Sequence, residues 1–130
     1  MIVADSSAWI DFIRRPDQRL GPALRHLLST EGVAMTGIVL VEILRGLRSD
    51  TAEEVGELLT ALPFIETTKE AWIRAGEMAR ALEEQGIPIP IGDVVIAATV
   101  LAGEHELLTR DKHFERIPGL RLYDWSKPDA

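Results

Sequence analysis

Ile2-Val3-Ala4-Asp5-Ser6-Ser7-Ala8-Trp9-Ile10, at the start of the chain, carries the clearest structural signal in the sequence. Three small or β-branched apolar residues lead directly into an acid and two serines, after which apolar residues recur at helical spacing. This order predicts a short buried strand, a polar turn and a helix. Because ligands of an open parallel sheet bind outside the carboxyl ends of its strands, Asp5 is expected at a ligand-binding position.

The rest of the chain repeats this alternation of short apolar stretches and amphipathic helices. Short strands are predicted at 2–4, 33–35, 64–65, 107–109 and 120–122, with helical stretches between them. Strands that alternate with helices form right-handed βαβ units, which build a parallel sheet covered by helices on both faces. The sequence therefore predicts an α/β fold with a central parallel sheet of about five short strands.

Several polar residues are predicted to mark helix starts. Thr36 is a predicted N-cap, and Thr51 followed by Glu54 has the spacing of a capping box. Asp93 is predicted to open the most apolar helix of the chain, which we expect to be buried because it is apolar nearly all round.

The composition limits the class of protein. At 130 residues the chain is most simply one domain, residues 1–130, with about 124–130 as a loose C-terminal tail. The absence of Cys excludes a disulfide framework, thiolate zinc sites and a Cys nucleophile. His26, His105 and His113 lie far apart without ligand-like spacing, so each is expected to be a surface or capping residue rather than a metal ligand.

Charge and hydropathy bear on location and partners. The first residues lack the basic and long apolar regions of a signal peptide, and no apolar run approaches the roughly 18 residues of a membrane span. We therefore expect a soluble cytoplasmic protein with no membrane partner. The formal net charge of -7 gives no long-range attraction for nucleic acid. An RNA substrate would need bound cations and local basic pairs, for which the candidates are Arg14 with Arg15, Arg45 with Arg48, and Arg110 with Lys112.

Four of the 21 acidic residues lie at positions that are unusual for solvent-exposed surface residues. Asp5 follows the buried first strand, Glu42 lies among apolar residues of a helix, Asp93 begins the most apolar helix, and Asp111 follows the fourth strand. Each also has a purely structural reading: Asp5 and Asp93 as N-caps, Glu42 as an outward residue of an amphipathic helix, and Asp111 as a turn residue. Their joint placement favours a function, because these positions of a doubly wound sheet can face one crevice.

Four carboxylates in one crevice are strongly disfavoured when they ionise together without a cation. Oxygen ligands with no Cys and no His pattern select Mg²⁺ or Mn²⁺. Paired hard cations suit hydrolysis of a phosphodiester, because one lowers the pKa of the attacking water and the other stabilises the leaving oxygen. Ser6 and Thr109 place hydroxyls beside two of the acids, where they could orient a carboxylate or hold a water at the metal, or only cap a helix and form a turn.

Four stretches of the chain, in order, carry a family resemblance. They are Asp5-Ser6-Ser7 after the first strand, Glu42 within Ile-Val-Leu-Val-Glu-Ile-Leu-Arg-Gly, Asp93 within Ile-Pro-Ile-Gly-Asp-Val-Val-Ile-Ala-Ala, and Thr109-Arg110-Asp111-Lys112-His113-Phe114. Together they resemble the PIN domain, and most closely the VapC-type toxin ribonucleases of bacterial and archaeal toxin–antitoxin pairs. The resemblance spans essentially the whole chain.

This resemblance implies a three-layer α/β/α fold over a single PIN domain and a Mg²⁺- or Mn²⁺-dependent endoribonuclease, a hydrolase that cleaves structured RNA such as tRNA or rRNA. Asp5, Glu42, Asp93 and Asp111 would then be the catalytic and metal-binding quartet. Thr109 matches the hydroxyl position before the last acid, and Ser6 stands where Thr is commoner. The resemblance also implies a homodimer and a cognate VapB-type antitoxin whose C-terminal segment wraps the toxin and blocks its site.

Three other readings compete with this one. A haloacid-dehalogenase-type phosphatase needs a second Asp two residues after the first, where this chain has Ser7. A phospho-accepting receiver domain needs an acid pair near the first strand and an Asp after a middle strand, where this chain has Glu66. The alternative from a different class is a non-cleaving PIN-like module that binds RNA or a partner, and the intact quartet argues against it.

An apolar stripe on the first helix has two readings of its own. Trp9, Phe12 and Ile13 recur at helical spacing and are predicted to belong to the core. The alternative is a groove that receives a helix of the antitoxin.

Overall fold

The computed structural model describes residues 1–126, whose five strands form one parallel sheet. Residues 127–130, which make up most of the predicted tail, lie outside the described residues. The strand order is β3-β2-β1-β4-β5, so the first strand lies at the centre. The strands are β1 (Ile2–Ala4), β2 (Val33–Thr36), β3 (Phe64–Ile65), β4 (Glu106–Leu108) and β5 (Arg121–Leu122). The predicted parallel sheet of about five short strands is confirmed.

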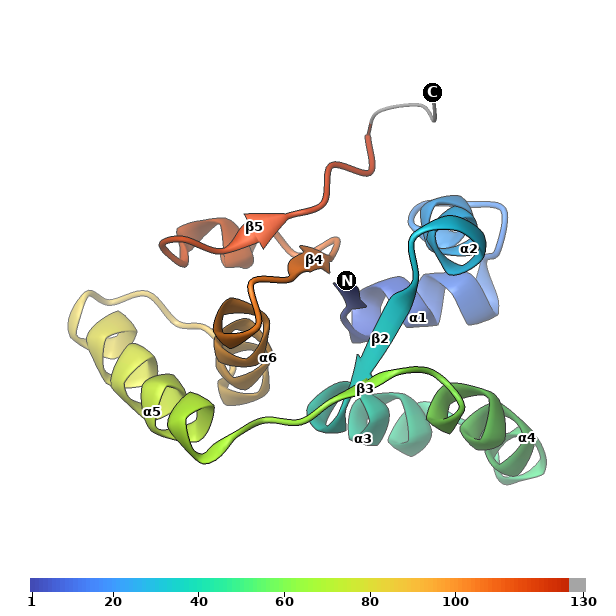
Figure 1. The fold of residues 1–130 in the computed structure, drawn as a ribbon, viewed down its shortest axis with the longest axis horizontal. Coiled ribbons are helices and arrows are strands. Elements are labelled where there is room, and N and C mark those ends of the chain that lie inside the picture. The colour runs from blue at the N-terminus through green and yellow to red at the C-terminus, as the bar shows by residue number, and fades with distance from the viewer. Residues whose placement is uncertain (127–130) are drawn as a thin grey trace.

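Helices cover both faces of this sheet. They are α1 (Ser6–Arg14), α2 (Gly21–Thr30), α3 (Gly37–Gly46), α4 (Ser49–Thr60), α5 (Lys69–Glu84), α6 (Ile91–Ala102) and the short 3₁₀ helix η1 (Lys112–Arg116). Figure 1 shows α1 and α2 together on one side of the strands and α5 with α6 on the other side. The predicted three-layer α/β/α arrangement is therefore confirmed. No helix within residues 1–126 is both long enough and apolar enough to cross a membrane.

The centre of the sheet is buried on both faces, as expected for parallel strands that helices cover. Val3 and Ala4 of β1 have no exposed surface, and neither do Leu107 and Leu108 of β4. The neighbouring strand is tied to the turn after β1, because the Asp5 N–H donates to the Leu108 carbonyl at 3.1 Å. The carboxyl ends of β1 and β4 are therefore fixed side by side.

Helix α6 supports the same edge of the sheet from the opposite layer. Its residues from Val94 to Val100 are all buried, because the sheet lies on one side and α5 on the other. The helix begins at Ile91 after Pro90, so Asp93 lies in its first turn and is not its N-cap. The prediction that Asp93 opens the helix is wrong by two residues, since Pro at the N-cap and two further residues precede it.

Two other predicted caps also differ from the structure. Helix α4 begins at Ser49 with Arg48 as the N-cap residue, and the Thr51 hydroxyl donates to the Arg48 carbonyl at 3.1 Å, so Thr51 does not cap the helix. Thr36 occupies the N-cap position of α3 as predicted, but its buried hydroxyl makes no capping hydrogen bond.

The apolar stripe of α1 belongs to the core. Trp9 is only 3% exposed and packs edge-on against Phe12, with ring centroids 5.9 Å apart. Phe12 and Ile13 are half-buried and pack against the same core. The prediction that Trp9 belongs to the core is confirmed. A groove for an antitoxin helix, which was the alternative, would have to form without the Trp9 ring.

Candidate active site

Asp5 is the most buried of the four acids, with 1% of its surface exposed at the carboxyl end of β1. One carboxylate oxygen, Oδ1, accepts the Ser7 hydroxyl at 2.6 Å and the Ala8 N–H at 3.1 Å. The other, Oδ2, accepts the Thr109 hydroxyl at 2.5 Å. The capping reading of Asp5 is thus correct for one oxygen. The second oxygen is held by the neighbouring strand end and is positioned independently of the helix.

The loop after β4 is bound to this carboxylate by a chain of hydrogen bonds. The Thr109 hydroxyl accepts the Asp111 N–H at 3.0 Å while it donates to Asp5. Ser7 accepts the Arg110 N–H at 3.2 Å while it donates to Asp5. Thr109 therefore orients a carboxylate, which is one of the roles that the sequence left open. The Thr109 and Ser7 hydroxyls together fix the backbone that carries Asp111.

An ion pair between a partly exposed Arg and a buried Asp anchors the same loop. The Arg110 guanidinium lies 2.8 Å and 3.1 Å from the two carboxylate oxygens of Asp11, which is 2% exposed in α1. The Leu20 N–H also donates to Asp11, at 3.5 Å. A carboxylate in such a place needs a cation, and Arg110 supplies it. Arg110 is therefore a counterion of Asp11, and its role with Lys112 as a basic pair for RNA stays a prediction.

Asp93 and Asp111 meet at the other side of the site. Asp93 Oδ2 lies 2.7 Å from His113 Nε2, and one ligand atom from each of Asp93, Asp111 and His113 lies within 4.8 Å of the others. Asp111 is the residue before η1, but its side chain makes no capping hydrogen bond, so the turn reading does not account for its carboxylate. His113 is half-buried in this cluster, where it bonds to Asp93, a contact that its predicted role as a surface or capping residue did not include.

Glu42 approaches from α3. Its Oε1 is buried and has no hydrogen-bond partner, which contradicts the reading of Glu42 as an outward surface residue. A Cβ added to Gly92 would lie 3.6 Å from Glu42 Oε2, so the first turn of α6 lies directly against this carboxylate. The Ser6 hydroxyl is a hydrogen-bond partner that lowers the pKa of Glu42. Ser6 therefore acts on a carboxylate of the quartet, as the sequence suggested.

The electrostatics connect the four acids. Burial raises the pKa of Asp5 to about 6, although three hydrogen bonds lower it, and the charge of Asp111 raises it further. Burial also raises the pKa of Glu42 and of Asp93, and repulsion by Asp111 adds to both. Asp93 itself repels Glu42, whereas His113 lowers the pKa of Asp93. The four acids thus share one region, in which each ionised carboxylate raises the cost of ionising the next.

This donor set fits a hard divalent cation. The site offers carboxylate oxygens, one buried oxygen without a partner, and one imidazole at its edge. Oxygen ligands in this number suit Mg²⁺ or Mn²⁺, and an imidazole among them is compatible with the softer Mn²⁺. A cation would also remove the mutual repulsion that raises the pKa values of three of the acids.

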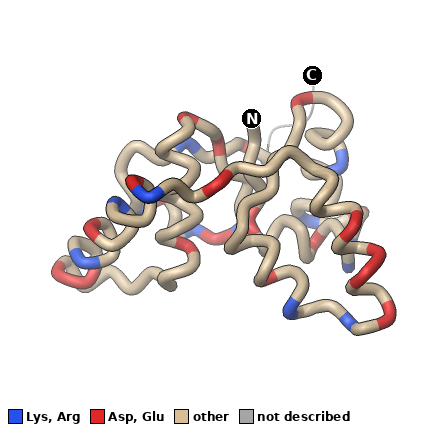
Figure 2. The backbone as a smooth tube through the Cα atoms, turned by 60° about the horizontal axis from the view of Figure 1, so that its bottom comes forward, with Lys and Arg blue, Asp and Glu red and all other residues tan. Residues whose placement is uncertain are grey.

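Positive charge around the site is sparse. In the view of Figure 2, the Lys and Arg positions are spread among acidic positions along the chain and do not gather on one stretch. Arg45 is close enough to lower the pKa of Glu42. Arg48, its predicted companion, lies 3.6 Å from Asp50 in an exposed pair. Attraction for a polyanion near the quartet therefore depends on a bound cation and on single residues such as Arg45.

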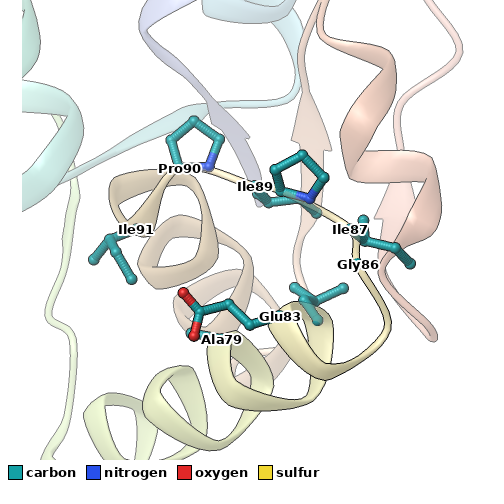
Figure 3. Close-up of a pocket in the computed structure, with 9 residues that line it drawn as sticks. Ala79, Glu83, Gly86, Ile87, Ile89, Pro90 and Ile91 are labelled. Carbon is teal, nitrogen blue, oxygen red and sulfur yellow. The ribbon is translucent and has the colours of Figure 1, made fainter.

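A separate hollow lies away from the quartet. A cavity of about 560 Å³ opens between the end of α5 and the segment 86–91, and Figure 3 shows it lined by isoleucines, prolines and the single acid Glu83. None of the four acids of the quartet lines it. This cavity therefore takes no part in the candidate site.

Sequence reasoning missed three residues that build the site. Ser7 and Asp11 were assigned no role in the site and His113 was predicted to lie outside it, yet each bonds to a residue of the site or of its loop. Asp11 carried a weak signal, because it lies three residues after Ala8 on the buried face of α1. His113 also had one, because it follows Asp111 by two residues in the same exit loop.

Comparisons with known proteins identify the family. The PIN domain model matches residues 2–120. The chain is 30% identical over 127 residues to Ribonuclease VapC1 of Methanocaldococcus jannaschii, which covers 95% of this chain and 87% of that relative. It is 28% identical over 107 residues to the tRNA(fMet)-specific endonuclease VapC of Salmonella typhimurium, covering 78% of this chain and 81% of the relative.

A solved structure gives the same result for the fold. A chain in the crystal structure of VapBC2 from Rickettsia felis, bound to a DNA fragment from its promoter, superposes with a TM-score of 0.81 at 26% identity. The match covers 96% of this chain and 99% of that one. Since the family model spans residues 2–120 and a VapC relative is 30% identical over 95% of this chain, this chain belongs to the PIN-domain family, among its VapC-type members.

Proposed function

We propose that this protein is a divalent-metal-dependent endoribonuclease, the toxin of a VapBC-type toxin–antitoxin pair, which hydrolyses phosphodiester bonds of structured RNA such as tRNA or rRNA. Membership of the family and the ribonuclease activities for which the relatives are named support the reaction class. We propose Asp5, Glu42, Asp93 and Asp111 as the catalytic and metal-binding acids. Ser6 and Thr109 are proposed to orient two of them.

One observation carries the proposal more than any other. The buried Asp5 accepts the Thr109 hydroxyl, ligand atoms of Asp93, Asp111 and His113 lie within 4.8 Å of one another, and a buried oxygen of Glu42 has no partner. Burial raises the pKa of Asp5, Glu42 and Asp93, and the charge of Asp111 adds to each rise. Such an arrangement destabilises the folded chain unless a cation binds there. Proteins retain buried, mutually repelling acids mainly at functional sites, which favours a metal site over a structural role.

The chain's own residues define what the site can do. Thr109 and Ser7 fix both oxygens of Asp5, so its carboxylate is oriented before any ligand arrives. Glu42 presents a buried oxygen with no other partner, and His113 Nε2 fixes Asp93 Oδ2. A cation held by these residues would act as a Lewis acid on the phosphate and would make a water more acidic.

Partners follow from the same membership. We propose a cognate VapB-type antitoxin, in line with the VapBC complex whose chain superposes on this one, and a homodimer of single-domain subunits, residues 1–130. The net charge of -7 makes a basic antitoxin segment a suitable ligand for the acidic site. If a small reading frame lies beside this gene, its co-expression with this protein, followed by size-exclusion chromatography, tests this partner.

The test of the reaction uses the antitoxin-free protein. Purified protein should cut structured RNA with Mn²⁺ or Mg²⁺ and should not cut it with chelator. Asp5→Asn and Asp93→Asn should abolish cleavage, whereas Asp17→Asn, at a side chain that is 87% exposed, should cut like the wild type. Cutting by both quartet variants would refute the site assignment. A wild type that binds RNA but cuts none would favour the non-cleaving module.

A further inference from the structure

A hollow that no part of the proposed chemistry uses opens beside the acidic quartet. It is a cavity of about 330 Å³, and Thr109 and Asp111 line it on the side of the site. Tyr123 and Trp125, from the segment after β5, line it too. Ligand cavities usually measure about 300–1,000 Å³, so this one has room for a single ring system and its sugar rather than for a helix or a duplex.

Two aromatic residues, Tyr123 and Trp125, line this cavity. The Tyr123 N–H donates to the Leu107 carbonyl at 2.8 Å, which fixes the segment to the end of β4. Trp125 is 39% exposed, although indole rings are normally well buried in a folded chain. An exposed indole within reach of a nuclease-type site is suited to stacking, because every nucleobase presents a π-face.

The charges of the cavity argue against a phosphate as its occupant. Asp111 and the exposed Glu115 line it, and Arg110 is neutralised by Asp11. Lys112 is the remaining cation among its lining residues, and it sits beside Asp111 at the site. Carboxylates accept hydrogen bonds from the amino groups of bases, whereas they repel phosphate.

We propose that this cavity binds one unpaired nucleobase of the RNA, adjacent to the phosphate that faces the quartet, with the base stacked on Trp125 and an amino group directed to a carboxylate such as Glu115. The proposal rests on the proposed ribonuclease function, since the quartet places the scissile phosphate. Lys112 contacts the backbone between the two positions. Sequence-selective recognition of RNA generally uses unpaired bases in this way. Trp125 is therefore a residue that selects where the RNA is cut.

The test measures binding apart from cleavage. A short single-stranded RNA is titrated by fluorescence anisotropy with Ca²⁺ in place of Mg²⁺, for the wild type and for Trp125→Ala, Trp125→Phe and Trp72→Ala. Trp125→Ala should weaken binding about 5- to 150-fold, the range for loss of one base–aromatic stack. Trp125→Phe keeps an aromatic face and should retain most of the affinity. Trp72→Ala, at a 50% exposed indole on α5, is the matched control and should bind like the wild type.

A second set of RNAs shows whether a base is responsible. One abasic site is moved along the oligonucleotide, and at one position it should weaken binding to the wild type but not to Trp125→Ala. Equal losses for intact and abasic RNA, or wild-type affinity in Trp125→Ala, would overturn the proposal. Thermal unfolding by circular dichroism shows that each variant is folded.

The outcome also separates this inference from the proposed function. If the wild type cleaves RNA with Mg²⁺ while the abasic position and Trp125 act independently, only the base site is wrong. If the wild type neither cleaves nor binds any RNA, the proposed function fails and the base site fails with it. In the expected result, Trp125→Ala also loses its preference among cleavage positions while its cleavage remains metal-dependent.

Discussion

Replacement of Asp5 by Asn should change how the stability of the metal-free protein depends on pH. Burial raises the pKa of Asp5 from 3.8 to about 6 in the folded chain. The Asp5 carboxyl therefore binds its proton more tightly in the folded state than in the unfolded state. The stability that this protonation contributes is fully present below pH 3.8 and is lost as the pH rises through about 6. A pKa difference of this size corresponds to about 3 kcal/mol. Asn cannot ionise, and its carbonyl oxygen can still accept the Ser7 hydroxyl and the Ala8 N–H.

The free energies of unfolding of the wild type and of Asp5→Asn should therefore diverge with pH. Relative to the wild type, Asp5→Asn should gain about 3 kcal/mol between acidic and neutral pH. The measurement is urea unfolding followed by far-UV circular dichroism in chelator, over a series of pH values on both sides of pH 6. Asp17→Asn, which changes an exposed carboxyl, is the control and should follow the wild type at every pH.

Divalent cations should reverse this difference at neutral pH. Mg²⁺ or Mn²⁺ binds only the folded state, so it should raise the stability of the wild type as its concentration rises. Asp5→Asn should respond much less, because it has lost a charged ligand. A constant difference in unfolding free energy between wild type and Asp5→Asn across the whole pH series would refute the reasoning, since it would mean that the buried carboxyl of Asp5 ionises as it does in the unfolded chain.

Three further changes test the surroundings of the site. Arg110→Ala leaves the buried Asp11 carboxylate without its cation and should lower the free energy of unfolding in urea by about 3–5 kcal/mol. Adding Asp11→Asn should recover part of that loss, whereas additive losses from the two substitutions would contradict the pairing. His113→Ala releases Asp93 and should weaken Mn²⁺ binding by roughly 10- to 100-fold in calorimetry, whereas an unchanged affinity would remove His113 from the site. Phe114→Ala empties a fully buried position and should cost about 3–5 kcal/mol; a loss below 1 kcal/mol would show that this position is not core.

The features that the sequence predicted best are those that local pattern determines. The strand before Asp5 was predictable because three apolar residues next to a polar turn describe a short buried strand, and the structure places β1 at Ile2–Ala4. Helix α6 was predictable as buried because nearly every residue of it is apolar. Its start was misplaced by two residues, since Pro90 occupies the cap position that an acid was expected to hold.

The features that the sequence did not reveal depend on contacts between distant residues. Asp11 and Arg110 are 99 residues apart, and neither stands out locally: one is an acid within an amphipathic helix, the other a cation in a loop. Thr109 and Asp5 are 104 residues apart, and their hydrogen bond exists only because β4 pairs with β1. Helix periodicity and capping rules describe neighbours along the chain, so they predict which residues lie at the edge of the sheet but not which atoms bind each other there.

The ion pair of Arg110 and Asp11 limits how this protein can recognise RNA. The Arg110 guanidinium lies in the loop that carries Asp111, where it could hold a phosphate. It instead forms an ion pair with the carboxylate of Asp11, which is 2% exposed. With a net charge of -7, the chain gives no long-range attraction for RNA that could replace the charge of Arg110. Under the two proposals above, attraction comes from short range: a cation among the four acids, the nearby Arg45 and Lys112, and stacking in the cavity that Trp125 lines. Such contacts favour an RNA whose bases are already unpaired, because a duplex hides the faces on which stacking depends. The Arg110–Asp11 pair that holds the loop in place thus also makes the choice of RNA substrate depend on RNA shape more than on phosphate charge.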